Sequence, residues 1–255
     1  MTRDAVPDGG VKSDRTLFAI IELLKDKDGA GVTELAGQLD LAKSSVHKHL
    51  RTMEEHGYVV KRDGRYHIGL QFFHYGEYAR NQYDVFHAAT AKVEELADET
   101  GEMSWIMAHE NGRAMYLFGD GGTTEINVNS VIGSWTNMHC TSGGKAMLAH
   151  LPRAEVEAVV DRHGLPARTE NTVTDRDALF SELAEIRDRG YALNLGEDLE
   201  GIHAVGVPLA FEGAIQGALT VAGPAHRLPR ERCETDLADL LLAAANDVEL
   251  NLAYN

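Results

Sequence analysis

The sequence predicts an α+β protein in two parts, an N-terminal winged helix-turn-helix and a larger domain of helices and antiparallel strands. Three observations lead to this prediction. Residues 13–56 contain three short helical patterns, residues 58–68 contain two alternating segments around an Asp-Gly pair, and residues 83–255 alternate helical and strand-like patterns. The length of 255 residues suits one large domain or two small ones, and a hydrophobic content of 44% is typical of a globular protein.

Charge is distributed unevenly along the chain. Residues 1–80 carry 12 basic and 12 acidic side chains, whereas residues 81–255 carry 12 basic and 28 acidic ones. The net charge of −16 therefore lies in the C-terminal part, which should repel nucleic acid, and the neutral N-terminal part is better suited to meet it. Eight lysines against 16 arginines, with a surplus of carboxylates, also indicate a salt-adapted organism.

The sequence shows no sign of a membrane or secreted protein. Cys140 and Cys233 are the only cysteines, too few for a disulfide framework. No apolar run approaches the ~18 residues that would span a bilayer, and the N-terminus lacks the apolar core of a signal peptide. We therefore expect a cytoplasmic protein that does not use a membrane as a partner.

The first two helices are predicted from apolar spacing and capping residues. Apolar residues from Leu17 to Leu24 recur at i, i+3, i+4 and i+7, which predicts an amphipathic helix over residues 13–25. Ser13 is expected to be its N-cap, and Thr33 is expected to cap a short second helix.

A third helix and a hairpin complete the first domain. The helix is predicted from roughly Lys43 to His56, with Val46, Leu50 and Met53 on one stripe. The Asp63-Gly64 pair that follows predicts a hairpin, because both turn positions need a positive φ. Three helices and a two-stranded ribbon form a winged helix-turn-helix, in which the last helix enters the major groove of DNA.

The polar side of the third helix and the ribbon carry the expected contacts to double-stranded DNA. Hydroxyl groups at the start of a helix suit phosphates, and the outward-facing Lys48 and Arg51 could reach base edges. An alternative interpretation is a winged helix that binds proteins through a solvated basic face. The expected DNA-binding residues are Arg15, Lys43, Ser44, Ser45, His47, Lys48, Arg51, Thr52, Lys61, Arg62 and Arg65.

These motifs resemble a known family. The run from Leu41 to Leu50 (LAKSSVHKHL), the Gly57-Tyr58-Val59 segment and the run from Asp63 to Leu70 (DGRYHIGL) are similar to the DNA-binding domain of the IclR family of transcriptional regulators. The resemblance is collinear from Lys12 to Leu70. It implies a winged helix-turn-helix that binds operator DNA.

Aromatic side chains gather on the segment that connects the two parts. Residues 70–101 read as helix with one break near Asn81, and six of the 15 Phe and Tyr side chains lie between Phe72 and Phe86. Such rings need a partner surface. We expect a homodimer or a dimer of dimers, and the alternative is that the rings pack on the larger domain of the same chain.

The larger domain is predicted as a mixture of helices and an antiparallel sheet. The Asn111-Gly112 pair predicts a hairpin between strands at 103–110 and 113–120, and Glu212-Gly213 predicts a second turn. Further strands are expected at 191–195, 202–211 and 215–222, and helices at 144–150, 153–162, 177–189 and 229–252.

A glycine-rich segment carries the most distinctive chemistry of this domain. Residues 138–146 read Met-His-Cys-Thr-Ser-Gly-Gly-Lys-Ala, a glycine-rich turn that leads into a helix. Unpaired N–H groups and the positive end of the helix dipole favour a small anion there. We expect Ser142, Gly143 and Gly144 to hold the carboxylate of an organic acid.

Three other interpretations of this segment are weaker. A P-loop needs a glycine at position 139 and a hydroxyl residue at position 146, where His139 and Ala146 stand. A Cys140 or Ser142 nucleophile with a His139 or Lys145 base has no third orienting group. A metal site lacks motif spacing, although the ligand types are present at His139, Cys140, His203 and Cys233, and no cofactor is expected.

The second half of the chain also resembles the IclR family. The glycine-rich segment, residues 194–208 and residues 218–224 are similar to its GAF-like effector-binding domain. The resemblance implies a ligand-responsive regulator, dimeric or a dimer of dimers. Asn194 departs from the acidic residue of some relatives, and Ala204 and Ala222 replace polar side chains. The implied pocket residues are Val128, Thr136, Ser142, Gly143, Asn194, Ile202, Ala204, Thr220 and Ala222.

The sequence thus predicts a transcriptional regulator rather than an enzyme. We expect a flexible tail at 1–10, a winged helix-turn-helix at 11–70, a linker helix at 71–82 and a GAF-like domain at 83–255. A small organic acid bound by the last domain is expected to change operator affinity. The alternative is a small-molecule-processing enzyme with an accessory helix-turn-helix.

Overall fold

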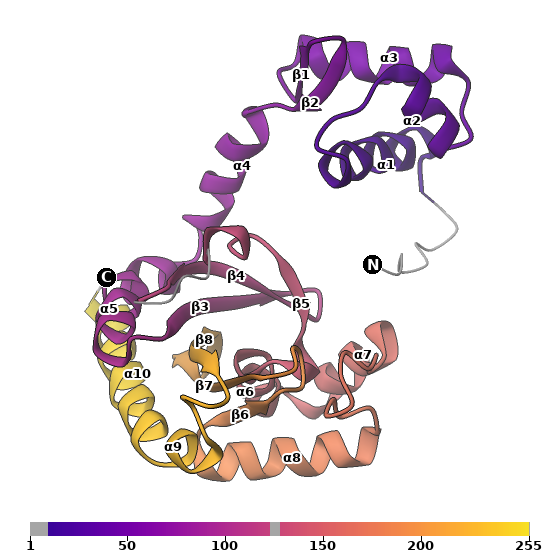
Figure 1. Cartoon of the computed structure of the whole chain (residues 1–255). Helices are drawn as coiled ribbons and strands as arrows, with labels where there is room; N and C mark the ends of the chain where they lie inside the picture. Colours follow the sequence, from indigo (N-terminus) through magenta and orange to yellow (C-terminus); the bar gives the residue numbers. More distant parts are fainter. Residues whose placement is uncertain (1–9, 123–127, 255) are drawn as a thin grey trace. The chain divides into compact units, whose positions relative to one another are not determined.

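The computed structural model describes residues 10–122 and 128–254 (Figure 1). The chain divides after Arg80 into two compact units. Apart from Gly10, the tail expected at residues 1–10 lies outside the described residues.

The N-terminal unit is a winged helix-turn-helix, as the sequence predicts. Its buried residues form one apolar cluster. Among them, Ile20, Leu35, Val46 and Leu50 come from the first three helices. The elements are α1 (Lys12–Asp26), α2 (Val32–Gln38), α3 (Lys43–Glu55), β1 (Val59–Arg62), β2 (Arg65–Ile68) and α4 (Gln71–Arg80).

The wing forms because its turn residues accept a left-handed backbone. Asp63 has φ of 49° and Gly64 has φ of 79°, so Arg62 pairs directly with Arg65 across a two-residue loop. The wing is joined to the connection between α1 and α2 by two backbone hydrogen bonds between Ala30 and Tyr66, of 2.9 and 3.0 Å.

Two predicted helix caps are wrong. Helix α1 starts one residue before Ser13, with Val11 at the N-cap position, and the Ser13 hydroxyl instead donates to Asp14 (3.1 Å). Helix α2 starts at Val32 after Gly31, so Thr33 lies within its first turn. Both residues already have helical backbones, and a cap side chain must come from the residue before the helix.

The C-terminal unit is built on one six-stranded antiparallel sheet. The strand order is β5-β4-β3-β8-β7-β6. The strands are β3 (Met103–Glu110), β4 (Arg113–Asp120), β5 (Trp135–Asn137), β6 (Ala192–Leu195), β7 (Ile202–Phe211) and β8 (Ala214–Pro224). The hairpins at Asn111-Gly112 and Glu212-Gly213 are confirmed, and all four turn residues have positive φ. The short edge strand β5 was not predicted.

Helices cover both faces of this sheet, and each face has its own core (Figure 1). One face packs on α5 (Asp84–Thr100), α9 (Arg230–Glu234) and α10 (Asp236–Tyr254). The other packs on α6 (Ser142–His150), α7 (Arg153–His163) and α8 (Arg176–Arg189). Short 3-10 turns, η1 (Val128–Ser130) and η2 (Met138–Cys140), precede α6.

The last predicted helix is in fact two helices. The sequence predicts one helix over 229–252, but α9 and α10 are separated at Thr235, whose φ of −116° and ψ of −98° are not helical. The apolar pattern continues through this break, because Cys233 and Leu237 are both buried in the same core. Apolar spacing alone therefore gave no sign of it.

Candidate functional site

The polar face of α3 is open to solvent. Val46, Leu50 and Met53 are buried beneath the helix, which leaves the opposite side to polar residues. Of the predicted contacts on this helix, Ser45 is half-buried and the others are exposed: Lys43, Ser44, His47, Lys48, Arg51 and Thr52. The helix therefore presents a continuous polar surface, with Lys48 and Arg51 at its centre.

Two of these side chains already have partners on the helix itself. Nε of Arg51 donates to Oε1 of Glu55 at 2.8 Å, and the Thr52 hydroxyl donates to the Lys48 carbonyl at 3.2 Å. The hydrogen bond that Arg51 donates to Glu55 raises the pKa of Arg51 above its ordinary value, so the guanidinium stays charged. Arg51 is nevertheless largely exposed, with 73% of its side chain accessible.

The basic side chains of the wing differ in whether they bond to the rest of the unit. Lys61 and Arg62 are exposed, and the Lys61 ammonium lies 5.3 Å from the centre of the Tyr66 ring. Arg65 instead donates to the Gly29 carbonyl at 2.5 Å and lies 3.4 Å from Glu34. Arg65 thus holds the wing to the rest of its own unit. Arg15, predicted on the same surface, is half-buried.

The second predicted site lies on the sheet face covered by α6. Asn194, Ala204 and Ala222 are directly paired across β6, β7 and β8, so their side chains share one face of the sheet. Thr220 is two residues from Ala222 and therefore points the same way. Its methyl group lies close to Gly143 at the start of α6, which identifies this face as the one beneath the helix.

Glycines allow α6 to approach the sheet. A Cβ on Gly143 would lie 2.7 Å from the Met107 sulfur and 2.8 Å from the Thr220 methyl group, and a Cβ on Gly206 would lie 2.6 Å from the Ser142 carbonyl carbon. These glycines therefore have a packing role. A bulky residue at position 143 would disturb the core whether or not a ligand binds there.

Fewer backbone N–H groups are free at the start of α6 than the sequence predicts. The N-cap is Thr141, whose hydroxyl oxygen accepts the Gly144 N–H at 3.2 Å. The prediction that Gly144 offers an unpaired N–H is therefore wrong. Ser142 and Gly143 remain at the positive end of the helix dipole, and both are buried.

The other predicted effector residues lie on or beside the same face. Thr136 pairs with Ala114 between β5 and β4, and Ala114 belongs to the core on this face. Val128 packs on that core from η1, and Ile202 is half-buried at the start of β7. Asn194 is only 5% exposed, and its Oδ1 accepts the backbone N–H of Glu197 at 2.7 Å.

Polar residues that the sequence did not single out surround this face. The Tyr116 ring lies 5.1 Å from that of Trp105, edge to face, and burial raises the pKa of its hydroxyl. Arg168 donates to Asp198 at 3.2 Å. No local motif signals these residues, which come from separate strands and loops.

The nucleophile interpretation of the glycine-rich segment is not supported. Burial raises the pKa of Cys140 to about 12, and its thiol lies 3.6 Å from Asp198. Lys145 is fully buried, and its ammonium group is held 2.6 Å from each of two carboxylates, Glu182 and Glu197. Burial lowers the pKa of His139, whose Nε2 lies 3.2 Å from the Pro166 carbonyl.

The four suggested metal ligands do not converge. His203 and Cys233 both bond to the Leu228 carbonyl, at 2.8 and 3.5 Å, whereas Cys140 bonds to the Asn137 carbonyl at 3.4 Å. Within residues 10–122 and 128–254, no group of three or more His, Cys, Asp or Glu side chains is placed to hold a metal ion.

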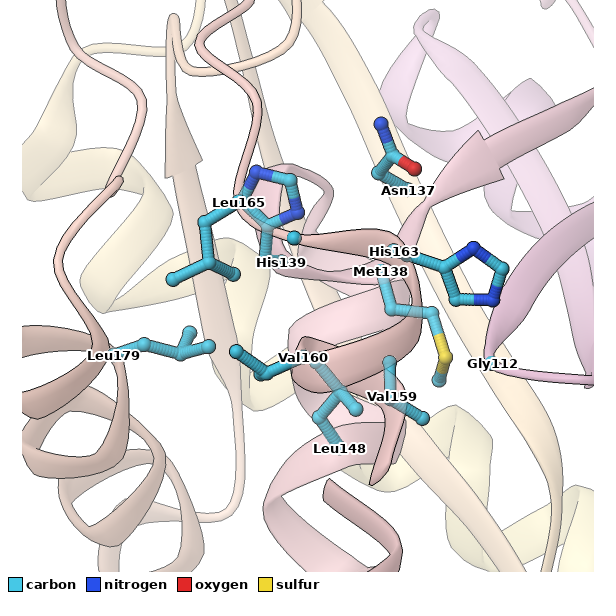
Figure 2. Close-up of a pocket in the computed structure, with 11 residues that line it drawn as sticks. Gly112, Asn137, Met138, His139, Leu148, Val159, Val160, His163, Leu165 and Leu179 are labelled. Atoms are coloured by element: carbon cyan, nitrogen blue, oxygen red, sulfur yellow. The ribbon is translucent and has the colours of Figure 1, made fainter. Parts of the chain in front are cut away.

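A small pocket lies beside the predicted effector face but is not formed by it (Figure 2). Its volume of about 10 Å³ is at the lower limit for a single water molecule. None of the ten predicted effector residues lines it. Figure 2 shows His139 and Leu165 on one side and Met138 and His163 on the other. The lining residues are Gly112, Asn137, Met138, His139, Leu148, Val159, Val160, His163, Gly164, Leu165 and Leu179.

Among the residues that the structure describes, no helix is both long enough and apolar enough to cross a lipid bilayer.

Comparison with known proteins identifies both units. Residues 15–63 match the family described as the IclR helix-turn-helix domain, and residues 78–250 match the family described as the bacterial transcriptional regulator IclR C-terminal domain. The chain is similar to the probable HTH-type transcriptional regulator ArcR of Halobacterium salinarum, with 29% identity over 239 residues that cover 91% of this chain and 90% of the relative.

Solved structures show the same fold. The IclR protein of Thermotoga maritima has a TM-score of 0.76 at 27% identity, covering 95% of this chain and 98% of that protein. An IclR homolog from Microbacterium hydrocarbonoxydans, solved in complex with 4-hydroxybenzoate, has a TM-score of 0.78 at 19% identity and covers 94% and 100% of the two chains.

Proposed function

This chain belongs to the IclR family of transcriptional regulators, and from that premise we propose which of its residues bind operator DNA and which bind the effector. The protein is a DNA-binding regulator with a C-terminal effector-binding domain, and its relatives are regulators rather than enzymes.

The exposed face of α3 is the part of the N-terminal unit that enters the major groove. The observation that carries this assignment is the separation of α3 into a buried apolar stripe and an exposed polar face centred on Lys48 and Arg51. Lys48 and Arg51 read base edges, and Ser44 and Ser45 meet phosphates at the start of the helix. Glu55 holds Arg51 through a hydrogen bond of 2.8 Å and so limits its orientation before DNA arrives.

The wing contributes positioning contacts to the DNA backbone. Lys61 and Arg62 are exposed and can reach phosphates, whereas Arg65 is already occupied by Gly29 and Glu34. The role of Arg65 is therefore to fix the angle of the wing. Lys43, His47 and Thr52 complete the contact surface on α3, with half-buried Arg15 at its margin.

The effector is a small organic acid bound on the sheet face beside the start of α6. Its carboxylate meets the backbone N–H groups of Ser142 and Gly143 at the positive end of α6. The remainder of the molecule lies along Asn194, Ala204, Thr220 and Ala222, with Val128, Thr136 and Ile202 around them. The two alanines make this surface more apolar than a polar pair would, which favours an acid with a hydrocarbon body.

Isothermal titration of the full chain with a panel of small carboxylic acids tests this site. The panel includes 4-hydroxybenzoate, the molecule found with the Microbacterium relative. Thr220→Val keeps the shape of the buried side chain and removes its hydroxyl, and Ser142→Ala removes the hydroxyl at the helix start. An acid that binds the natural protein is expected to bind both variants more weakly. Unchanged affinity in both would exclude these two positions from the site.

The regulator acts as a homodimer or a dimer of dimers. Helix α4 has no buried residue, and Phe73 is 66% exposed on it. An exposed phenylalanine beside other exposed rings favours a second copy of the chain as its partner. Selection of binding sites from random DNA tests the DNA and assembly proposals together, because a two-fold dimer selects two related half-sites. Selection of a single half-site would contradict the dimer, and selection of none would contradict DNA reading by α3.

A further inference from the structure

Three ionisable side chains meet inside the C-terminal unit, and Lys145 lies between the other two. Its Nζ atom is 2.6 Å from Oε1 of Glu182 and 2.6 Å from Oε1 of Glu197, and its side chain is 0% exposed. Lys145 comes from α6, Glu182 from α8, and Glu197 from the connection between β6 and β7. One ammonium group therefore faces two carboxylates, and we refer to these three residues as the Lys145 triad.

The second oxygen of each carboxylate is also buried. Among the described residues, Oε2 of Glu182 and Oε2 of Glu197 receive no hydrogen bond. The Glu197 side chain is only 10% exposed. A buried carboxylate with one oxygen left without a donor is disfavoured in its charged form relative to a carboxylate in water, which favours its protonated form.

Neighbouring groups do not supply the missing positive charge. Arg168 is paired one to one with Asp198 at 3.2 Å. Burial lowers the pKa of His139, so its ring is uncharged at neutral pH, and burial raises the pKa of Cys140 to about 12, so its thiol is also uncharged. With both glutamates ionised, the triad would carry an excess negative charge in a buried site.

We propose that the Lys145 triad binds one proton at neutral pH, held on the Glu197 carboxyl, so that it is a neutral, single-proton binding site next to the effector face. The proton is taken from solvent, and no other group changes its bonding. As the pH rises the proton returns to solvent and the triad becomes negatively charged. In agreement with this, the pKa of Glu197 is raised: burial is the largest cause and the charge of Glu182 adds to it, while Lys145 and a backbone hydrogen bond at Leu195 oppose it.

The charge of the triad matters for the effector, a consequence that rests on the proposed effector site. Lys145 follows Ser142 and Gly143 within the first turn of α6, which rises about 5.4 Å along the axis. The Glu197 backbone is held by Asn194 on the effector face. A neutral triad leaves the positive helix end available to a carboxylate, whereas a negative triad opposes the same anion. An acidic effector should therefore bind with uptake of a proton and more weakly at higher pH.

Infrared spectroscopy of the full-length protein tests for the proton on Glu197 directly. A protonated carboxyl has a carbonyl stretch above the amide band, and the natural protein is expected to show this signal at neutral pH and to lose it in alkaline solution. Glu182→Gln and Glu197→Gln each leave one lysine with one carboxylate, so each single variant should lose the signal. Glu102→Gln is the matched control, because Glu102 is 3% exposed but is paired one to one with Arg227. It should leave the signal unchanged.

Absence of the signal in the natural protein, or its persistence in both single variants, would overturn the proposal. If Glu197→Gln does not fold, Glu182→Gln alone provides the test. It is the milder substitution, because the Glu182 side chain is 24% exposed. A second measurement is the free energy of unfolding as a function of pH. A raised pKa means that the folded state binds more protons, so this stability is full below the ordinary pKa of glutamate and is lost as the pH rises through the raised pKa.

The Glu197→Gln variant should lack that fall in stability. If the free energy of unfolding fell equally with pH in the two proteins, that would also contradict a proton held on Glu197. Neither measurement contains an effector, so both outcomes are independent of whether any acid binds. Titration with 4-hydroxybenzoate and the Thr220→Val variant addresses the effector site separately.

Discussion

Asn194 and Glu197 are joined by a buried hydrogen bond in which the Asn194 Oδ1 accepts the Glu197 backbone N–H at 2.7 Å. The bond shapes the turn after β6 and places Glu197 against Lys145. Asn194 therefore has a structural task in addition to its proposed place on the effector face.

We expect Asn194→Ala to lower the free energy of unfolding by about 1–3 kcal/mol, because it leaves a buried N–H group without an acceptor. Asn171→Ala is the control, since Asn171 is exposed and its side chain is recorded with only a 3.4 Å hydrogen bond to the Leu195 carbonyl. It should change stability by less than about 0.5 kcal/mol. Urea unfolding followed by tryptophan fluorescence suits the comparison, because Trp105 and Trp135 both lie in the C-terminal unit. Equal losses in the two variants would contradict the role of Asn194.

Replacing Lys145 should be more damaging than replacing a surface lysine. Lys145→Met leaves two buried carboxylates without their cation, which is expected to lower the free energy of unfolding by about 3–5 kcal/mol. The loss should be larger at higher pH, where Glu197 has released its proton. Lys92→Met is the matched control, because Lys92 pairs with Glu95 and Asp247 at the surface and such pairs contribute about 0–1 kcal/mol. A small, pH-independent loss for Lys145→Met would show that the triad is not a buried ionic site.

Cys140 should be unreactive in the folded protein. With its pKa raised to about 12, only about one thiol in ten thousand is ionised at pH 8, and thiolate is the reactive form. Cys233 is also buried, with a pKa raised to about 11. Iodoacetamide at pH 8 should therefore label neither residue in the native protein and both after unfolding, as measured by mass spectrometry. Rapid native labelling of Cys140 would revive the nucleophile interpretation.

Arg65 should stabilise the wing rather than contact DNA. Arg65→Ala removes the hydrogen bond to the Gly29 carbonyl and should speed amide exchange at Ala30 and Tyr66 about fivefold, for a contribution of about 1 kcal/mol. Arg62→Ala should leave exchange at the same amides unchanged, since Arg62 is exposed. Hydrogen–deuterium exchange measures both. The assignment fails if Arg62→Ala has the larger effect.

The turns of this protein could be predicted from sequence because their chemistry is local. Asp63-Gly64 and Asn111-Gly112 adopt the positive φ values that such pairs favour, and the strands beside them fall where expected. The edge strand β5 was missed because three half-buried residues give no periodic signal. The predicted face of α3 also followed from spacing within a single helix.

The Lys145 triad could not be predicted in the same way. Its two ion pairs join residues 37 and 52 positions apart, and neither glutamate stands in a motif. The sequence indicated that the segment around Lys145 has distinctive chemistry. It did not indicate that the Lys145 ammonium pairs with two glutamates of the same chain. The predicted N-cap of α1 was wrong by a small shift of the helix start, since Ser13 lies two residues after the true N-cap, Val11.

The proposed function depends most on the insertion of the exposed α3 face into the major groove. The most direct test is a gel-shift titration of the full chain and its Lys48→Ala/Arg51→Ala variant on DNA selected by the natural protein, with Lys25→Ala as an exposed basic control on α1. The double variant is expected to lose at least about 1–3 kcal/mol of binding free energy, a tenfold weakening or more, while Lys25→Ala binds as the natural protein does. Binding of the double variant at the natural affinity and with the same sequence preference would contradict the assignment.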